Sequence, residues 1–111
     1  MIYNEYDVVV VPFPFTDKSA SKRRPALVLS SKKFHDKELH YVLTMITSTE
    51  NEGWFLDTEI TKLDDAGLPS PSKVRMKIFT LDGELILKKI GSLAQVDRKN
   101  VKSSLKSLLG I

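Results

Sequence analysis

Two apolar runs near the start of the chain limit most strongly what it can fold into. They are residues 8–11 (VVVV) and residues 26–29 (ALVL). Short, continuous runs rich in β-branched side chains are typical of strands that are buried on both faces of a sheet. Pro12 and Pro14 follow the first run and cannot donate hydrogen bonds to a sheet, so we expect the first strand to end there.

The segment between the two runs is basic. Residues 18–24 contain no acidic residue and four cations, which are Lys18, Lys22, Arg23 and Arg24. Arg24 directly precedes Pro25, and a proline ring disfavours the helical conformation for the residue before it. We therefore expect a loop over residues 15–21, with Arg24 extended at the entrance of the second strand.

Further strand-like segments follow at short intervals. Residues 39–46, 54–60, 73–81 and 84–90 are rich in β-branched and aromatic side chains, and turn-forming residues separate them. In residues 73–81 Val74, Met76, Ile78 and Thr80 alternate with Arg75, Lys77 and Phe79, so one face would be apolar and the other largely cationic. The Asp-Gly pair at 82–83 predicts a two-residue hairpin between the last two strands.

Two segments have helical character. Residues 61–66 predict a short helical turn that Gly67 ends. Ser92 followed by Gln95 has the spacing of a capping box, and apolar residues then recur at helical spacing up to Gly110. The sequence therefore predicts a C-terminal helix.

These patterns together predict a mainly β protein with short helices. Short strands separated by turns favour a small, strongly bent antiparallel sheet or an open barrel, covered by the C-terminal helix. A chain of 111 residues has room for one hydrophobic core. We expect one domain over residues 1–111.

Composition argues against several classes of protein. The chain has no cysteine, and its two histidines have no regular spacing to acidic residues, so we expect no disulfide, no metal and no other cofactor. No apolar run approaches the roughly 20 residues that span a bilayer, and the N-terminus lacks the features of an export signal. We expect a cytoplasmic protein without a membrane partner. The net charge of +3 permits binding to nucleic acid.

The stretch DVVVVPFPFTDKSASKRRPALVLS, followed by VLTMITS and then by AGLPSPSKVRMKIFTLDGELILKKIGSL, resembles the MazF/PemK-type toxins, which are sequence-selective endoribonucleases of toxin-antitoxin pairs. The likeness covers nearly the whole chain. Its most specific part is the arginine-proline pair that opens the second strand, and residues 34–52 match only loosely. The resemblance implies an SH3-like barrel of the CcdB/MazF/PemK kind that pairs as a homodimer.

The resemblance also implies a function. It is that of the toxin component of a type II toxin-antitoxin system, an mRNA interferase that cleaves single-stranded RNA without a metal. The partners implied are single-stranded RNA and a cognate antitoxin protein. Two alternatives remain open, because fold alone does not fix function. One is a toxin of the same fold that poisons DNA gyrase by binding, and the other is a degenerate member that binds RNA or an antitoxin without cutting.

Two residues match the family's catalytic positions. Metal-free RNA cleavage needs cations that stabilise the charge on the phosphorane, and a guanidinium presents a planar donor fork to phosphate oxygens. The resemblance implies that Arg24 is catalytic, although an arginine at a strand edge is often simply solvated. It also implies a catalytic hydroxyl at the end of the third strand, which is Thr47, with Ser48 as the rival if the register differs by one residue.

Further cations are candidates for binding the RNA backbone. Lys22 and Arg23 precede Arg24, and Arg75 and Lys77 share one face of their strand because they are two residues apart. These cations and Ser48 are the expected RNA-binding residues, and phosphate contacts of this kind are independent of sequence and sensitive to salt. The alternative for the strand pair is an ordinary solvated sheet face.

Three positions depart from the family pattern. Tyr6 stands where the family usually has glycine, which predicts a differently shaped first turn. Lys77 stands where some PemK-type members have a catalytic aspartate, and Phe79 where many relatives have arginine. An aromatic side chain at that last position could instead stack on an unpaired base.

Other reactive or aromatic residues are interpreted as structural. His35 and His40 lack a recognisable catalytic partner, so we interpret them as surface or structurally satisfied histidines. Trp54 and Phe55 form an isolated aromatic pair of a kind that usually belongs to a core.

Overall fold

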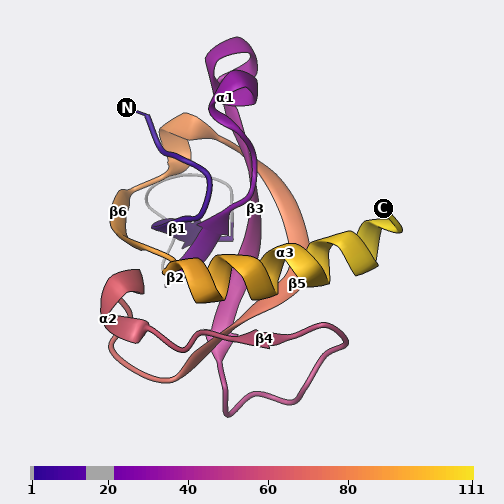
Figure 1. Cartoon of the computed structure of the whole chain (residues 1–111). Coiled ribbons are helices and arrows are strands. Elements are labelled where there is room, and N and C mark those ends of the chain that lie inside the picture. Colours follow the sequence, from indigo (N-terminus) through magenta and orange to yellow (C-terminus); the bar gives the residue numbers. More distant parts are fainter. Residues whose placement is uncertain (1, 15–21) are drawn as a thin grey trace.

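The structure is a computed structural model that describes residues 2–14 and 22–111. In these residues one antiparallel sheet has the strand order β4-β5-β3-β2-β1-β6 (Figure 1). The strands are β1 (Asp7–Phe13), β2 (Lys22–Val28), β3 (His40–Ser48), β4 (Thr58–Glu59), β5 (Ser72–Asp82) and β6 (Lys88–Ser92). The helices are α1 (Lys32–Glu38), α2 (Leu63–Ala66) and α3 (Gln95–Leu109), with a 3-10 turn at Gly83–Leu85. The predicted fold class, mainly β with short helices and a C-terminal helix, is confirmed. The predicted loop 15–21, with Lys18, lies outside the described residues.

The valine run of β1 is buried on both faces of the curled sheet, as its composition predicts. Val9 and Val11 belong to a core cluster that also contains Tyr41 and Leu43 of β3. Val8 belongs to a second cluster on the opposite face, which α2 and α3 cover; its other buried members are Leu27, Ile46, Ile60, Ala66, Leu68, Val74, Leu93 and Val101. The two clusters fix the middle of the sheet between two apolar layers.

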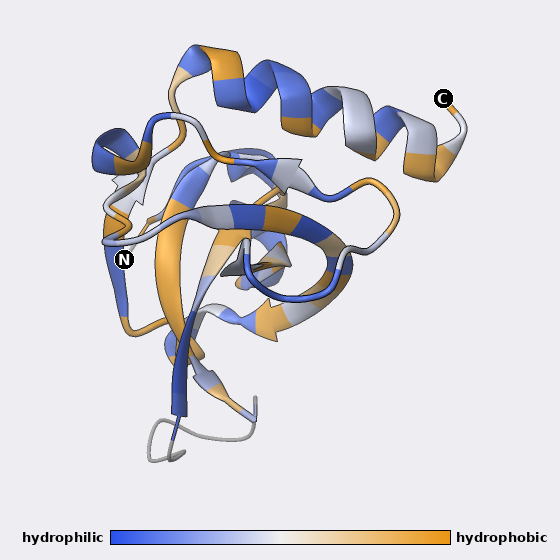
Figure 2. Cartoon of the chain, turned by 90° about the horizontal axis from the view of Figure 1, so that it is seen from below, coloured by the Kyte–Doolittle hydropathy of each residue, from blue (hydrophilic) through white to orange (hydrophobic). Residues whose placement is uncertain are grey.

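Helix α3 forms a separate layer over the face of the sheet that carries the Val8 cluster, and its C-terminal turns extend past the body of the molecule (Figures 1 and 2). Asp97 in its first turn is fully buried and accepts hydrogen bonds from the Thr61 N–H, the Thr61 hydroxyl and the Lys62 N–H, at 2.8 to 3.0 Å. These bonds attach the helix to the segment that precedes α2. No helix of the described residues is long and apolar enough to cross a membrane.

The first strand ends between the two prolines that the sequence predicts as its end, although Pro12 itself still belongs to it. β1 continues through Pro12 to Phe13, and Pro25 lies inside β2 opposite Val10. Proline is tolerated in a strand where one edge is unpaired. Both positions meet this condition, because β6 pairs with β1 only up to Val10 and β3 pairs with β2 only from residue 26 onward. Arg24 is therefore extended within β2, as predicted.

Three local predictions are wrong. In the segment 54–60 only Thr58–Glu59 is a strand. The Asp-Gly pair does not form a hairpin, because residues 83–85 form a 3-10 turn and β6 pairs with β1 instead of β5. The capping box does not form either. Helix α3 starts at Gln95 after Ala94, and the Ser92 hydroxyl donates a hydrogen bond of 2.6 Å to the Asp7 carboxylate.

The alternation predicted for β5 holds only in part. Val74 and Met76 face the cluster under α3, whereas Phe79 and Leu81 belong to the cluster on the other face. Each face of β5 is thus covered over a different half of its length, and Ile78 is left exposed. Phe79, considered above as a base-stacking residue, packs against the core.

Tyr6 occupies the turn that leads into β1. It has a φ of 70°, in the left-handed region that favours glycine, and thus adopts this conformation at the position where the family usually has glycine. Its ring packs against the cluster under α3, and the Arg98 guanidinium lies 5.5 Å from the ring centre. The ring therefore gives this strained residue a packing role that glycine could not have.

Candidate functional site

A cleft of about 480 Å³ lies where the start of β2, the end of β3 and the segment before β5 meet. It is lined by Phe13, Arg24, Pro25, Met45, Ile46, Thr47, Ser48, Asn51, Leu68, Pro69, Ser70, Ser72 and Lys77. The strand order β3-β2-β1 places the end of β3 beside the start of β2, since these neighbours run antiparallel. Residues far apart in the sequence therefore line one surface.

Arg24 projects from β2, where its Cα is paired with that of Val11. Its side chain is exposed, and the guanidinium carbon lies 6.0 Å from the centre of the Phe13 ring. It forms no ion pair with any carboxylate of the described residues. The guanidinium donors are therefore available to an anion in the cleft.

Thr47 and Ser48 end β3 at the cleft. The Thr47 Oγ1 accepts a hydrogen bond of 2.5 Å from the Asn51 Nδ2. The Ser48 Oγ accepts a bond of 3.2 Å from the Glu50 N–H and so stabilises the turn that follows the strand. The structure thus brings Arg24, Thr47 and Ser48 to one cleft.

The other predicted RNA-binding cations lie in different surroundings. Lys77 lines the cleft, and its Nζ is 5.8 Å from the centre of the Trp54 ring. Lys22 and Arg23 are exposed at the start of β2, next to the cleft but not in its lining. Arg75 lies outside the lining and is bound by a carboxylate.

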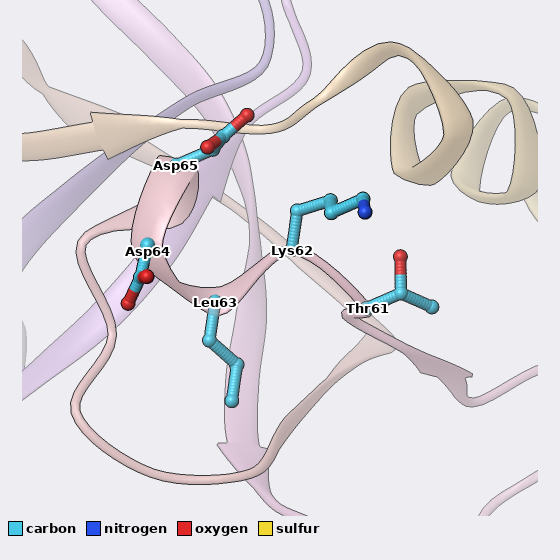
Figure 3. A pocket seen from close by; sticks show the side chains of 5 residues that line it. All are labelled: Thr61, Lys62, Leu63, Asp64 and Asp65. Atoms are coloured by element: carbon cyan, nitrogen blue, oxygen red, sulfur yellow. The ribbon is translucent and has the colours of Figure 1, made fainter.

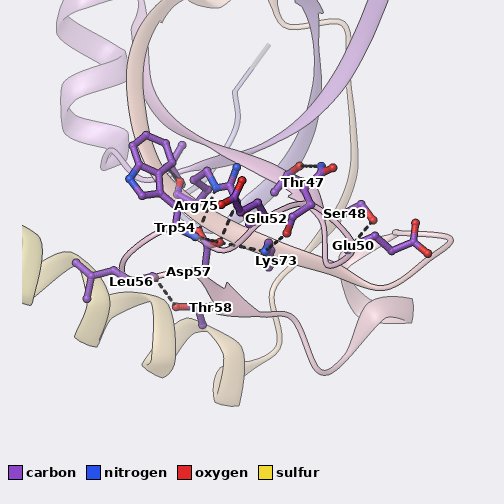
Figure 4. Close-up of polar contacts among 12 residues, drawn as sticks. Thr47, Ser48, Glu50, Glu52, Trp54, Leu56, Asp57, Thr58, Lys73 and Arg75 are labelled. Atoms are coloured by element: carbon purple, nitrogen blue, oxygen red, sulfur yellow. Dashed lines mark hydrogen bonds and ion pairs between the residues drawn. The ribbon is translucent and has the colours of Figure 1, made fainter.

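That carboxylate is Asp57, which lies between Arg75 and Lys73 (Figure 4). Arg75 donates to it from Nε at 3.2 Å and from Nη2 at 3.0 Å, and the Lys73 Nζ lies 3.2 Å from it. The Trp54 N–H donates a third bond of 2.9 Å. Burial would raise the pKa of Asp57, but the bonds from Arg75, Trp54 and Lys73 outweigh it and hold this pKa below its ordinary value.

The Asp57 cluster, meaning Asp57, Lys73 and Arg75, fixes the loop between β3 and β4. Arg75 also donates to the Glu52 carbonyl at 2.5 Å, and its guanidinium lies 5.4 Å from the centre of the Trp54 ring. The hydrogen bonds to Asp57 raise the pKa of the Arg75 guanidinium above its ordinary value. Trp54 and Phe55 are exposed on this loop and do not belong to a core, contrary to the sequence interpretation.

Sequence reasoning missed Asp57, Lys73 and Asn51. The signal for Lys73 was available, since it precedes Arg75 by two residues on one strand face. Asp57 was hidden because residues 54–60 were interpreted as a strand. Asn51 was missed because nothing in the neighbouring sequence indicates that its side chain bonds the Thr47 hydroxyl.

His35 is a structural residue that does not line the cleft. It is buried in α1, where its Nε2 lies 2.6 Å from the Ser30 Oγ and its Nδ1 lies 3.1 Å from the Tyr3 carbonyl oxygen. Burial lowers its pKa, although the bond to Tyr3 opposes the effect. The interpretation of His35 as a satisfied histidine is confirmed.

A second hollow of about 300 Å³ is lined by Thr61, Lys62, Leu63, Asp64 and Asp65. The two carboxylates point in different directions from the short helix α2, so they do not converge on one ligand (Figure 3). Within residues 2–14 and 22–111, no group of three His, Asp or Glu side chains is arranged to hold a metal ion.

Comparison with protein families decides the relationship. Residues 4–109 match the model of the PemK-like, MazF-like toxin of type II toxin-antitoxin systems. The chain belongs to this family. Among curated proteins no sequence matches the chain.

Solved structures of MazF toxins share the fold. The MazE-MazF complex from Deinococcus radiodurans matches with a TM-score of 0.77 at 21% identity, over 100% of this chain and 98% of that one. An endoribonuclease from a mycobacterial species, in complex with its cognate antitoxin, has a TM-score of 0.77 at 14% identity, over 98% and 94%. The Mycobacterium tuberculosis toxin MazF-mt6 has a TM-score of 0.73 at 18% identity, over 95% and 97%.

Proposed function

We propose that this MazF-like chain is a metal-independent endoribonuclease that cuts single-stranded RNA at a short sequence. The observation that carries the proposal is that Arg24 and Thr47, which match the family's catalytic positions, line the same cleft. The cleft is open and holds cationic and hydroxyl donors, which suits a phosphodiester.

In this proposal the 2′-hydroxyl of the RNA loses its proton as its oxygen attacks the adjacent phosphorus, and the 5′-oxygen leaves and takes up a proton. The products are a 2′,3′-cyclic phosphate and a 5′-hydroxyl, and a water molecule that opens the cyclic ester gives the 3′-phosphate. Arg24 stabilises the negative charge on the phosphorane, because a guanidinium stays protonated at any working pH. The Thr47 hydroxyl donates a hydrogen bond to a phosphate oxygen and holds the scissile group in place.

The surrounding polar residues position the RNA backbone. Lys22, Arg23 and Lys77 contact neighbouring phosphates, and Ser48 supports the turn beside Thr47. Arg75 does not contact the RNA in this proposal, because its guanidinium donates its hydrogen bonds to Asp57. It holds the loop that borders the cleft.

The proposed partners are a second copy of the chain and an antitoxin. Two of the structures described above contain an antitoxin bound to the toxin. We propose that a cognate antitoxin covers the cleft of this chain with an acidic or amphipathic segment, which would complement Arg24 and Lys77. In this proposal the chain acts on RNA in the cytoplasm.

Cleavage of a long single-stranded RNA in the presence of EDTA tests the function. Wild type should give discrete cuts that primer extension can map, and Arg24→Ala should lower the rate by about a hundredfold or more, as loss of a transition-state donor does. Lys99→Ala, which removes an exposed cation from α3, is the matched control and should cut like wild type. If folded wild type cuts none of several RNAs, the nuclease proposal fails and non-catalytic binding takes its place.

A further inference from the structure

The Thr47 hydroxyl is oriented by a neighbouring side chain within the cleft. The Asn51 Nδ2 donates to the Thr47 Oγ1 at 2.5 Å, and Asn51 itself lines the cleft. A side chain in a turn usually bonds the backbone of its own turn. The Asn51 side chain reaches back across the turn to the last strand residues instead.

The backbone of Asn51 is fixed on two sides. Its carbonyl oxygen accepts a bond of 2.8 Å from the Lys73 Nζ, and its N–H donates a bond of 3.1 Å to the Ser48 carbonyl. Lys73 is directly opposite Thr47 in the ladder between β3 and β5. Lys73, which lies opposite Thr47, therefore also holds Asn51, whose side chain bonds the Thr47 hydroxyl.

Lys73 is in turn held by the Asp57 cluster. It is only 7% exposed, and its Nζ lies 3.2 Å from the Asp57 carboxylate. Figure 4 shows Lys73 lying between Asp57 and the end of β3 that carries Thr47. A continuous set of contacts thus runs from the buried ion pair through Asn51 to the hydroxyl in the cleft.

This arrangement determines what the hydroxyl can do. A threonine hydroxyl has one hydrogen to donate and two lone pairs that accept. The amide N–H of Asn51 occupies an acceptor position, which leaves the hydroxyl hydrogen to rotate toward an acceptor in the cleft. A phosphate oxygen is such an acceptor.

We propose that Asn51 is a positioning residue that presents the Thr47 hydroxyl as a donor to the scissile phosphate. The inference rests on the proposed function and deepens it. Asn51 acts through Thr47, so its contribution should vanish when the hydroxyl is absent. A purely structural asparagine would contribute whether or not residue 47 carries a hydroxyl.

A double-mutant cycle with Asn51→Ala and Thr47→Val separates these cases. Asn51→Ala should lower kcat about tenfold with little change in KM, the scale of one hydrogen bond used in the transition state. In the Thr47→Val background the same change should have almost no further effect. Asn100→Ala, an exposed asparagine on α3, is the control and should leave kcat unchanged.

Multiplicative losses in the double variant would overturn the inference, as would a wild-type kcat for Asn51→Ala. Thermal unfolding of each variant accompanies the kinetics. If Asn51→Ala does not fold, Asn51→Ser, which is too short to reach Thr47, replaces it in the cycle. An inactive wild type would overturn the proposed function and this inference together, whereas an active wild type with an additive cycle overturns the inference alone.

Discussion

At the scale of single residues, His35 makes stability depend on pH. The ring joins the N-terminal segment to α1 through its bonds to Tyr3 and Ser30, and it stacks on Tyr41 with ring centres 3.7 Å apart. Burial lowers its pKa in the folded protein, outweighing the bond to Tyr3 and the nearby carboxylates. As the pH falls, the unfolded chain therefore takes up this proton first. The stability contributed by the neutral ring is present above the unfolded pKa of about 6.5 and is lost as the pH falls from there toward the lowered folded value.

We expect the free energy of unfolding of wild type, measured with urea, to fall between pH 7 and pH 5. His35→Asn removes the titrating ring, so its unfolding free energy should be lower at pH 7 but change less over the same interval. An equal fall in both proteins would assign the pH dependence to other groups.

At the scale of elements, the Asp57 cluster holds the loop between β3 and β4 against β5. The side chains of Asp57, Lys73 and Arg75 are 12%, 8% and 18% exposed, so breaking the cluster leaves cations largely out of water. Asp57→Asn keeps the shape but removes the charge, and it should cost roughly 3 kcal/mol of unfolding free energy. The control is Asp36→Asn, which breaks the exposed ion pair with Lys32 and should cost less than about 1 kcal/mol. Equal losses in urea unfolding would contradict a structural role for the cluster.

Elements were predictable from sequence where composition and burial agree. The valine run of β1 and the apolar run of β2 lie in the middle of the sheet, where local pattern and tertiary packing favour the same state. The predictions failed where a distant partner decides the structure. Ser92 bonds Asp7 instead of capping α3. Residues 54–57 form a turn in which the Trp54 N–H bonds the Asp57 carboxylate, and Lys73 and Arg75 of β5 stabilise this turn by pairing with Asp57.

At the scale of the whole molecule, the candidate site could be predicted in part. Arg24 and Thr47 were found through a family resemblance, and the strand order then brings them to one cleft. Spacing within the sequence could not have revealed this, because the residues come from different strands. The ion pair of Arg75 could not be foreseen, since its partner Asp57 lies on another segment of the chain.

The distribution of free and bound cations over the molecule leads to a last prediction about RNA affinity. Lys22 and Arg23 are exposed beside the cleft, whereas Arg75 forms an ion pair with Asp57. Each phosphate contact with single-stranded RNA should contribute about 0.7 to the slope of log affinity against log salt concentration. Binding of an uncleavable 2′-O-methyl RNA, measured from low to high salt, should therefore lose about 0.7 from this slope in Lys22→Ala and again in Arg23→Ala. Arg75→Gln should leave the slope unchanged while lowering stability, because it removes a partner of Asp57 and not of the RNA. A reduced slope in Arg75→Gln alone would place the RNA backbone along β5, away from the entrance of β2.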